Sequence, residues 1–347
     1  MTRIKLYPHE WPKSDQQMWA DLVASGNPLD GVGALSHVRG STSSQYEAGY
    51  GRWIAWLRDN DLAALLQAPL ARITPERAVA WMASMEHDAP YSRVMRLDML
   101  IRVVVAVHPE ADVAKLRRIR AIHYAQAQDD NGRRKQGRIL SGRVLLQAGL
   151  DLASPLAGTA ESSLQRMQML RDGTMVAFLA LLPVRIRAFV GLELHHSVLV
   201  TAHSIEIVLS PDMTKTGNPW TATVSAPLEG LIRCYLSEAR PFLLGRGPET
   251  HDMLWVADSG RPMSYSYTRR RICDLTERMT GVRVSPHFFR DAAATTLARE
   301  SPEHARMAGP LLGHTSFKTA EKHYNHARSI EAGRDYMESL QRIRNQS

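Results

Sequence analysis

The sequence predicts a mainly α-helical protein with a small antiparallel β-sheet in the second of two domains. Two domains are expected because 347 residues exceed one typical domain, and because a hydrophobic content of 44 % can fill two cores. Apolar residues that recur at helical spacing indicate the helices, and two β-branched stretches joined by a turn indicate the sheet. A polar, basic segment, Asp129 to Ser141, separates the two parts.

The first domain, residues 1–128, is expected to be entirely helical. Thr74 followed by Pro75 is a good N-cap with proline at the first helical position. We interpret Trp53, Trp56 and Trp81 as packing residues rather than as stacking surfaces for bases. The predicted helices cover Ser43 to Leu57, a segment from Pro75, Ser92 to Val107, and Asp112 to Ala127.

The predicted linker, residues 129–141, lies in the most basic stretch of the chain. The acidic residues there are Asp129 and Asp130, whereas nine cationic residues lie in and around the linker: Lys115, Arg117, Arg118, Arg120, Arg133, Arg134, Lys135, Arg138 and Arg143. Clustered cations gain free energy by displacing counterions from phosphates. We therefore expect Arg133, Arg134, Lys135 and Arg138 to contact the backbone of a nucleic acid.

The second domain, residues 142–347, is expected to mix helices and strands. Two strands are predicted over Ser197 to Leu209 and Trp220 to Ala226, joined by the turn PDMTKTGNP, and Leu254 to Val256 is a candidate third strand. Helices are predicted over Ser163 to Leu182, Leu228 to Leu244, Ser264 to Met279, Pro286 to Arg299, Pro302 to Leu312, Thr319 to Ala327 and Ile330 to Ile343.

Composition limits the protein's class. The formal charge of +8 and an isoelectric point near 9.6 favour a polyanionic partner. Cys234 and Cys273 form no C-x-x-C pair, so neither a disulfide framework nor a zinc knuckle is expected. The polar N-terminus and the short longest apolar run, Met175 to Val184, predict a cytoplasmic protein without a membrane partner.

Six arginine, lysine, histidine and tyrosine residues in distinctive local contexts follow one another along the second domain. A single H-x-x-R pattern carries little information in a chain with fourteen histidines. The order and context carry more: Arg185 in LLPVRIRAFVGLEL, Lys215 in the predicted hairpin turn, His287 and Arg290 in SPHFFRD, His314 in LLGH, and Tyr324 in HYNHA.

This ordered set resembles the tyrosine recombinase family, which includes phage integrases, Xer-type resolvases and transposon recombinases. The resemblance covers about Ser141 to Ser347, and the helical first domain resembles the family's core-binding domain in type. It implies a two-domain clamp around double-stranded DNA, and the basic linker residues become candidate DNA contacts. It also implies a homotetramer on two DNA sites, and accessory DNA-bending proteins are further candidate partners.

The residue types suit the chemistry that the resemblance implies. Arg185 and Arg290 can bind the equatorial oxygens of a phosphate in bidentate fashion. Tyr324 would form a 3′-phosphotyrosine, which conserves the energy of the broken bond, so neither ATP nor a metal nor another cofactor is expected. By resemblance, His287 or His314 helps the phenol lose its proton, and Lys215 protonates the departing 5′ oxygen.

Two positions depart from the family pattern. Ala188 stands where members often carry an acidic residue, three positions after the first arginine. Asp291 stands where a basic residue or a histidine is common after H-x-x-R, and it is a candidate to orient a catalytic arginine.

Three functions other than recombination are compatible with parts of the sequence. A type IB topoisomerase shares the chemistry, but the helical first domain and the trailing helix argue against it. A catalytically silent DNA-binding protein of the same fold is disfavoured by the complete set of six residues. A metallohydrolase using His323 and His326 lacks a nearby carboxylate pair and would be inactivated by a chelator.

Overall fold

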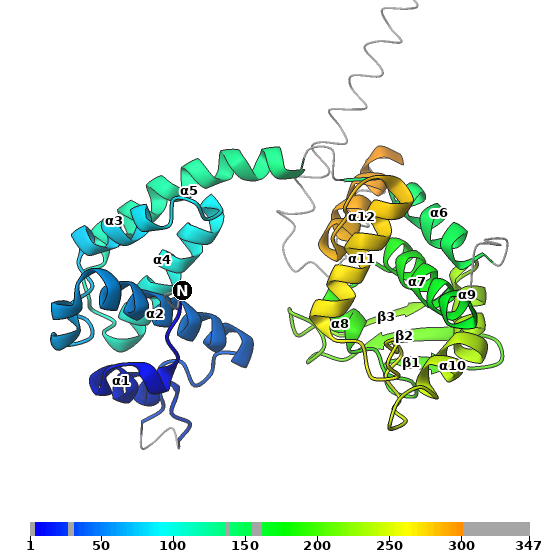
Figure 1. Cartoon of the computed structure of the whole chain (residues 1–347), viewed down its shortest axis with the longest axis horizontal. Helices are drawn as coiled ribbons and strands as arrows, with labels where there is room; N and C mark the ends of the chain where they lie inside the picture. Colours follow the sequence, from blue (N-terminus) through cyan, green and yellow to red (C-terminus); the bar gives the residue numbers. More distant parts are fainter. Residues whose placement is uncertain (1–3, 27–30, 136–138, 155–161, 301–347) are drawn as a thin grey trace, which may run out of the picture. The chain divides into compact units, whose positions relative to one another are not determined.

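The computed structural model describes residues 4–26, 31–135, 139–154 and 162–300, with side chains described for all of these except residues 129–135 and 298–300. The chain divides into two compact units, Met1–Lys135 and Gln136–Ser347, and each unit has its own hydrophobic core (Figure 1).

The described part of the first unit is helical. Its helices are α1 (Lys13–Val23), α2 (Gly40–Asn60), α3 (Pro75–Ser84), α4 (Pro90–Val107) and α5 (Ala114–Lys135), with short 3-10 turns at Pro8–Glu10 and Leu62–Leu66. The helix predicted after Thr74 is confirmed, and the Thr74 hydroxyl accepts from the Arg77 N–H at 3.3 Å. Trp53 and Trp81 are buried and pack edge to face, while Trp56 is half-buried and stacks on Trp53. The packing role predicted for the tryptophans is therefore confirmed.

Helix α5 is longer than expected. It continues past the predicted end at Ala127 to Lys135, so residues 129–135 of the predicted linker are helical. The expected linker rested on a loss of apolar periodicity, but a helix that is polar all round has no such periodicity. Arg, Lys and Gln have good helix propensity, and cations in the last turn interact favourably with the helix dipole.

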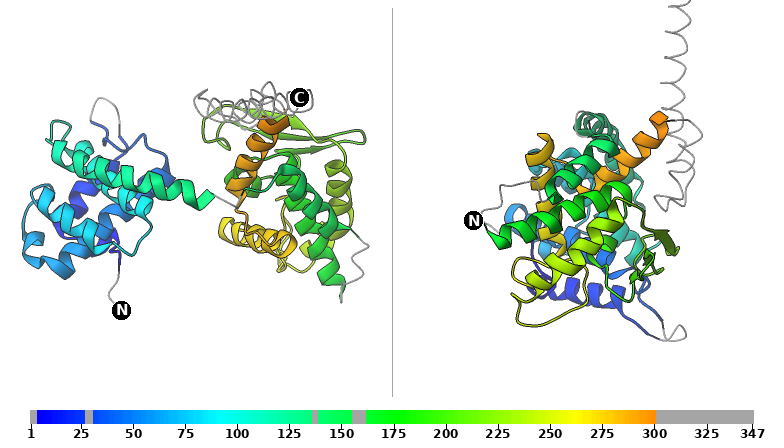
Figure 2. Two further views of the ribbon diagram at one scale, coloured as in Figure 1. Left: turned by 90° about the horizontal axis from the view of Figure 1, so that it is seen from above. Right: turned by 90° about the vertical axis from the view of Figure 1, so that its right-hand side faces the viewer.

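The second unit combines helices with one three-stranded sheet. Its helices are α6 (Gly142–Ala153), α7 (Ser163–Leu181), α8 (Ile186–Val190), α9 (Leu228–Cys234), α10 (Arg240–Leu244), α11 (Tyr265–Thr280) and α12 (Pro286–Glu300), and its strands are β1 (Val198–Val200), β2 (Ile205–Leu209) and β3 (Trp220–Thr223). The antiparallel sheet has the order β1-β2-β3 and forms a layer on one side of the helices (Figure 2). Ile205, Ile207 and Leu209 point from β2 into the core that contains Phe178, Phe189 and Trp255.

Two strand predictions need correction. Ser197 to Leu209 is a hairpin of β1 and β2 rather than one strand, because the Thr201 hydroxyl accepts hydrogen bonds from the His203 and Ser204 N–H groups and turns the chain. Leu254 to Val256 is not a strand. The chain there makes only isolated bridges, Glu193 with Met253 and Val256 with Pro262, so no ladder extends along it.

The remaining helix predictions of the second unit are confirmed where they can be compared. The helix predicted over Leu228 to Leu244 is continuous but contains a wider turn at Tyr235–Ala239, just before Pro241, which lacks an N–H. The three helices predicted beyond Pro302 lie outside the described residues. Among the described helices, none is both long and apolar enough to cross a membrane.

Candidate active site

Arg185 lies at the N-terminal end of α8. Helix α7 ends just before Pro183, and proline is common immediately after a helix because it cannot continue one. The chain then becomes extended, and Arg185 is the N-cap of α8, its carbonyl accepting from the Phe189 N–H at 2.9 Å. Arg185 is half-buried, whereas Arg187, the second arginine of the same LLPVRIRAFVGLEL segment, is exposed.

Arg290 comes from α12 and reaches the same segment. The helix begins at Pro286, so His287 lies in its first turn and Arg290 one turn later. His287 is exposed, but Arg290 is only 6 % exposed. Its Nη1 donates to the carbonyl oxygen of Pro183 at 2.6 Å, which places its guanidinium beside the chain that leads into Arg185.

The two arginines act on one another electrostatically. Burial lowers the pKa of Arg185 from its usual value. Burial, and after it the charge of Arg185, lower the pKa of Arg290 to about 10, while Asp291 acts in the opposite direction. Both groups remain cationic at neutral pH, yet each is held where its charge is disfavoured. An anion between them would relieve this destabilisation, so the pair forms a site suited to a phosphate.

Lys215 lies in the turn between β2 and β3, and its side chain is exposed. The turn opens with the Thr214 hydroxyl donating to the Pro211 carbonyl at 3.1 Å. Gly217 adopts a φ of +75°, a conformation that glycine accepts readily, and this lets the chain reverse into β3. The turn thus presents Lys215 at the end of a hairpin, as the sequence predicts.

A cavity of about 540 Å³ lies between α8 and the start of this turn. Ala188 lines it, at the position where an acidic residue was noted as common in the family. The small side chains of Ala188 and Gly191 leave this space beside the turn that carries Lys215. The other lining residues are Arg187, Glu193, His196, Ser197, Val208, Ser210, Asp212 and Met213.

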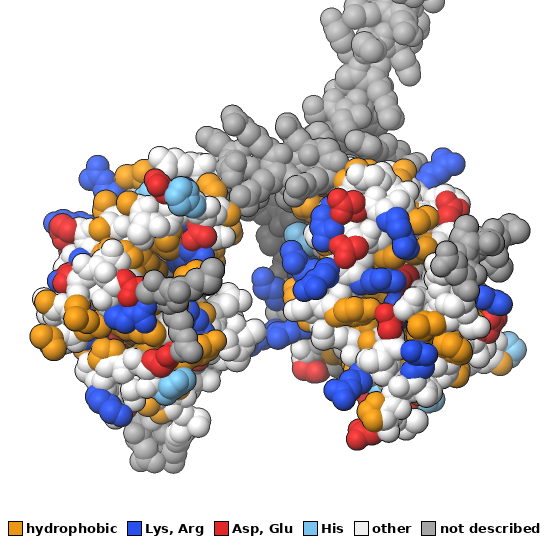
Figure 3. Space-filling view, in the orientation of Figure 1, with side chains coloured by type: hydrophobic (Ala, Val, Ile, Leu, Met, Phe, Trp, Pro, Cys, Tyr) orange, Lys and Arg blue, Asp and Glu red, His pale blue; other side chains and the backbone are white. Residues whose placement is uncertain are grey.

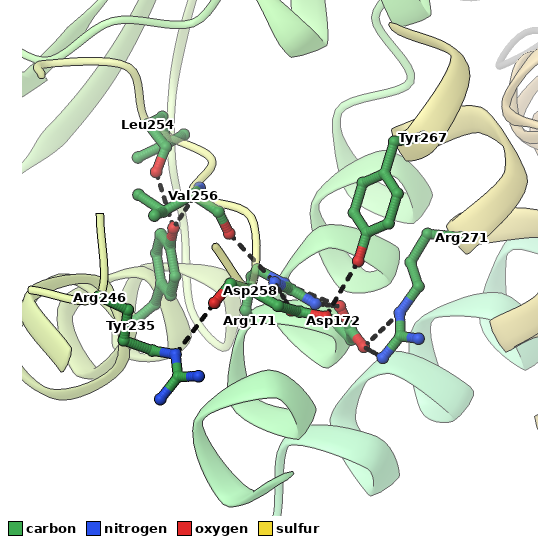
Figure 4. Close-up of polar contacts among 9 residues, drawn as sticks. All are labelled: Arg171, Asp172, Tyr235, Arg246, Leu254, Val256, Asp258, Tyr267 and Arg271. Atoms are coloured by element: carbon green, nitrogen blue, oxygen red, sulfur yellow. Dashed lines mark hydrogen bonds and ion pairs between the residues drawn. The ribbon is translucent and has the colours of Figure 1, made fainter. Parts of the chain in front are cut away.

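A buried ionic network that the sequence analysis missed joins α7 to α11 (Figure 4). Asp172 is 1 % exposed and accepts hydrogen bonds from Arg171 at 2.8 Å and from the Arg271 Nε at 2.9 Å. Arg171, fully buried, also donates to Asp258 at 2.6 Å, and Tyr267 donates to the same carboxylate at 3.2 Å. Burial lowers the pKa of Arg171, but the charges of Asp172 and Asp258 outweigh it and raise that pKa overall.

This network fixes the helix that leads to Arg185. Arg171 also donates to the Val256 carbonyl at 3.1 Å, so α7, α11 and the chain at 256–258 are bonded through one guanidinium. The sequence does contain one indication of this network, which is the adjacent Arg-Asp pair in the otherwise apolar helical segment LRDGTMVAFLALL. Such a pair in a buried helix needs internal partners.

Several predicted residues lie beyond the described side chains. His314, Tyr324 and Arg138 are outside the described residues, and Arg133, Arg134 and Lys135 are in the last turns of α5, where only the backbone is described. Among the described candidates, the structure brings Arg185 and Arg290 together. On the face of the second unit that Figure 3 shows, Lys and Arg side chains gather over α11 and α12, with acidic side chains between them.

The mainly helical fold with its small antiparallel sheet can be assigned to a class of proteins by comparison with protein families. Residues 156–330 match the phage integrase family, and the chain therefore belongs to that family, the tyrosine recombinases expected from the sequence.

Individual relatives agree with this assignment. Tyrosine recombinase XerC of Bacillus subtilis (strain 168) is 28 % identical over 91 residues, which cover 26 % of this chain and 30 % of XerC. The XerH site-specific recombinase bound to palindromic difH substrate in a post-cleavage complex superposes with a TM-score of 0.55 at 12 % identity, covering 92 % of this chain and 88 % of that chain. A lambda integrase tetramer bound to a Holliday junction gives a TM-score of 0.51 at 15 % identity, covering 92 % and 77 %. At these identities the two structures establish the fold.

Proposed function

We propose that this chain carries out site-specific recombination of double-stranded DNA through a covalent protein–DNA intermediate. The Tyr324 oxygen attacks a backbone phosphorus, the new Tyr–O–P bond forms, and the bond to the 5′ oxygen breaks. The products are a 3′-phosphotyrosine and a free 5′ hydroxyl. The reverse attack by a 5′ hydroxyl of another strand rejoins the DNA, and since the phosphoester energy is kept, the reaction consumes no ATP.

The six residues divide the tasks of the reaction among them in this proposal. Arg185 and Arg290 hold the non-bridging oxygens as charge builds on them. His287 or His314 helps the Tyr324 phenol lose its proton, and Lys215 donates the proton that the departing 5′ oxygen needs. The reaction requires no metal ion, because the two guanidiniums supply the positive charge.

The observation that carries the proposal is the convergence of Arg185 and Arg290. They come from separate segments, and Arg290 is almost fully buried with a pKa lowered to about 10 by burial and by its neighbour. The contact from Arg290 to Pro183 holds the Arg290 guanidinium beside the chain that leads into Arg185. A bound phosphate diester would suit two neighbouring guanidiniums in charge and could accept forked hydrogen bonds from each.

The complete assembly is part of the proposal. We infer that the two units close around duplex DNA as a clamp, with Arg133, Arg134, Lys135 and Arg138 near the phosphate backbone between them. Four copies on two DNA sites would exchange strands in pairs. The lambda integrase tetramer on a Holliday junction, which has the same fold, supports this stoichiometry.

A nicked suicide substrate tests the chemistry. The nick lets the short 5′ fragment diffuse away after cleavage, so wild-type protein accumulates as a covalent adduct that denaturing gels resolve. Tyr324→Phe should form no adduct while it binds the same DNA almost unchanged, because one hydroxyl supplies the nucleophile and almost none of the phosphate contacts. An adduct with Tyr324→Phe would assign the nucleophile to another residue. Plasmids with two target sites separate recombination from simple relaxation.

A further inference from the structure

We propose that Arg52, Arg93 and Arg96 form a phosphate-binding cluster on the first unit, where α2 and α5 pack against α4. This inference rests on the proposed function, since its ligand is the backbone of duplex DNA. None of the three residues belongs to the basic stretch that the sequence singles out. In Figure 1, α4 lies between α5 and α2, and both helices contact it.

The first part of the cluster joins α2 to α4. Arg52 of α2 is half-buried; burial lowers its pKa, and the charge of Arg96 on α4 lowers it further. The carboxylate that opposes this effect is Asp88, and Asp88 is already bonded to Arg96. The guanidiniums of Arg52 and Arg96 therefore repel one another, and the single carboxylate of Asp88 cannot balance both. This leaves excess positive charge at a partly buried position.

The second part is Arg93, one helical turn before Arg96 on α4. Its Nε is buried, and within the described part of the chain it has no hydrogen-bond partner. Arg93 also acts on His123 of α5, whose pKa is lowered by burial and then by the Arg93 charge. A buried donor without an acceptor destabilises the free protein, so Arg93 gains no stabilising internal bond through this atom.

The surroundings suit an extended polyanion better than a small anion. Next to His123 on α5, the Arg120 guanidinium lies 5.2 Å from the centre of the Tyr124 ring, and Tyr91 of α4 approaches the same ring at 6.3 Å. Toward its N-terminal end α5 exposes Lys115, Arg117 and Arg118. Cations spaced along one helix can follow successive phosphates of a duplex, and forked guanidiniums can bind each phosphate with two hydrogen bonds.

Two single variants and a matched control test the cluster in the full chain. Arg52→Met and Arg93→Met each remove one charge and keep most of the apolar stem. Arg58→Met removes the same charge from α2 at a position where Arg58 is bonded to Asp59 near the surface. The measurement is the affinity for a labelled duplex between about 50 and 200 mM salt.

The expected result separates a DNA contact from a structural role. Each cluster variant should flatten the slope of log K against log salt by about 0.9 unit, and Arg58→Met should not change it. Arg93→Met should melt at the wild-type temperature or above it, because it removes an unsatisfied buried donor. A structural arginine would behave in the opposite way, with a lower melting temperature and an unchanged slope.

Two outcomes overturn different claims. If wild-type protein forms the covalent adduct on nicked DNA but Arg52→Met and Arg93→Met keep the wild-type slope, the cluster is not a phosphate contact and the proposed function stands. If the wild type neither binds duplex DNA nor forms the adduct, the proposed function fails, and the cluster proposal fails with it.

Discussion

The Arg290 Nη1 donates a hydrogen bond to the Pro183 carbonyl at 2.6 Å, and this contact ties α12 to the chain that leads into Arg185. A lysine at position 290 keeps the charge but has neither the planar fork nor the reach to bond the carbonyl and a phosphate together. Arg290→Lys should therefore slow formation of the covalent adduct by about 10²- to 10³-fold.

Single-turnover cleavage of the nicked substrate measures this effect. Arg233→Lys is the matched control, because Arg233 forms a partly exposed pair with Glu229 one turn away on α9 and should cleave at the wild-type rate. Wild-type rates for Arg290→Lys would remove Arg290 from the phosphate site.

The buried network around Asp172 should dominate the stability of the second unit. Asp172→Asn removes the negative charge between Arg171 and Arg271 and leaves a fully buried guanidinium less compensated. We expect the unfolding free energy to fall by about 3–5 kcal/mol. Glu229→Gln, which breaks the partly exposed pair with Arg233, should lower it by about 0.5 kcal/mol or less. Urea denaturation of both variants gives the comparison, and equal losses would contradict a special role for the network.

How far the sequence predicts this molecule depends on the kind of signal each segment carries. The cap formed by Thr74 and Pro75 is local, so the start of α3 was predictable. The end of α5 was not, because a fully polar helix has no apolar period. The Arg171–Asp172 pair is adjacent in sequence, but its partners Asp258 and Arg271 are distant, and only tertiary packing brings them together.

The candidate site likewise has some features that the sequence predicts and others that depend on tertiary packing. The order of Arg185, His287 and Arg290 was readable as a motif. The bond from Arg290 to Pro183 was not, since a main-chain acceptor leaves no trace in residue identity. The lowered pKa of Arg290 likewise depends on burial that no local pattern reports.

A pH effect should appear at His123. Its pKa in the folded protein lies below the ordinary histidine value, first because of burial and then because of Arg93. The folded state therefore binds this proton less readily than the unfolded state. The stability contribution of neutral His123 is complete above its unfolded pKa of about 6.5 and is lost as the pH falls from there through the lower pKa of the folded state. Arg93→Met should raise the pKa of His123, though not fully to its ordinary value, because burial remains. NMR titration of the His123 imidazole in the wild type and in Arg93→Met measures this change. An equal pKa in both proteins would mean that Arg93 does not act on this ring.

The basic end of α5 should contribute to DNA binding through charge. Changing Arg133, Arg134 and Lys135 together to glutamine should flatten the slope of log K against log salt by up to about three units if each cation contacts one phosphate. The controls are circular dichroism, which checks that α5 stays helical, and Arg58→Gln, which removes a surface charge elsewhere in the same unit. A triple variant with the wild-type slope would leave these side chains in solvent.

Lys215 has the role that depends most on its place in the β2–β3 turn, and sulfur chemistry can isolate that role. If its ammonium protonates the 5′ oxygen as that oxygen leaves, Lys215→Ala should lose about 10²- to 10⁴-fold in cleavage rate. Arg185→Ala should also be slow, but because it no longer stabilises charge on the non-bridging oxygens, a demand that persists whichever group departs.

A substrate with sulfur in place of the bridging 5′ oxygen distinguishes the two variants, because a thiolate leaves without a proton. On that substrate Lys215→Ala should recover most of its cleavage rate, while Arg185→Ala should stay impaired. Thr216→Ala, which changes the neighbouring turn residue and keeps the lysine, controls for disturbance of the hairpin and should cleave both substrates like the wild type. If Lys215→Ala and Arg185→Ala fail equally on the sulfur substrate, Lys215 is not the acid, and its exposed position in the turn then makes it a contact to the DNA backbone or to a base.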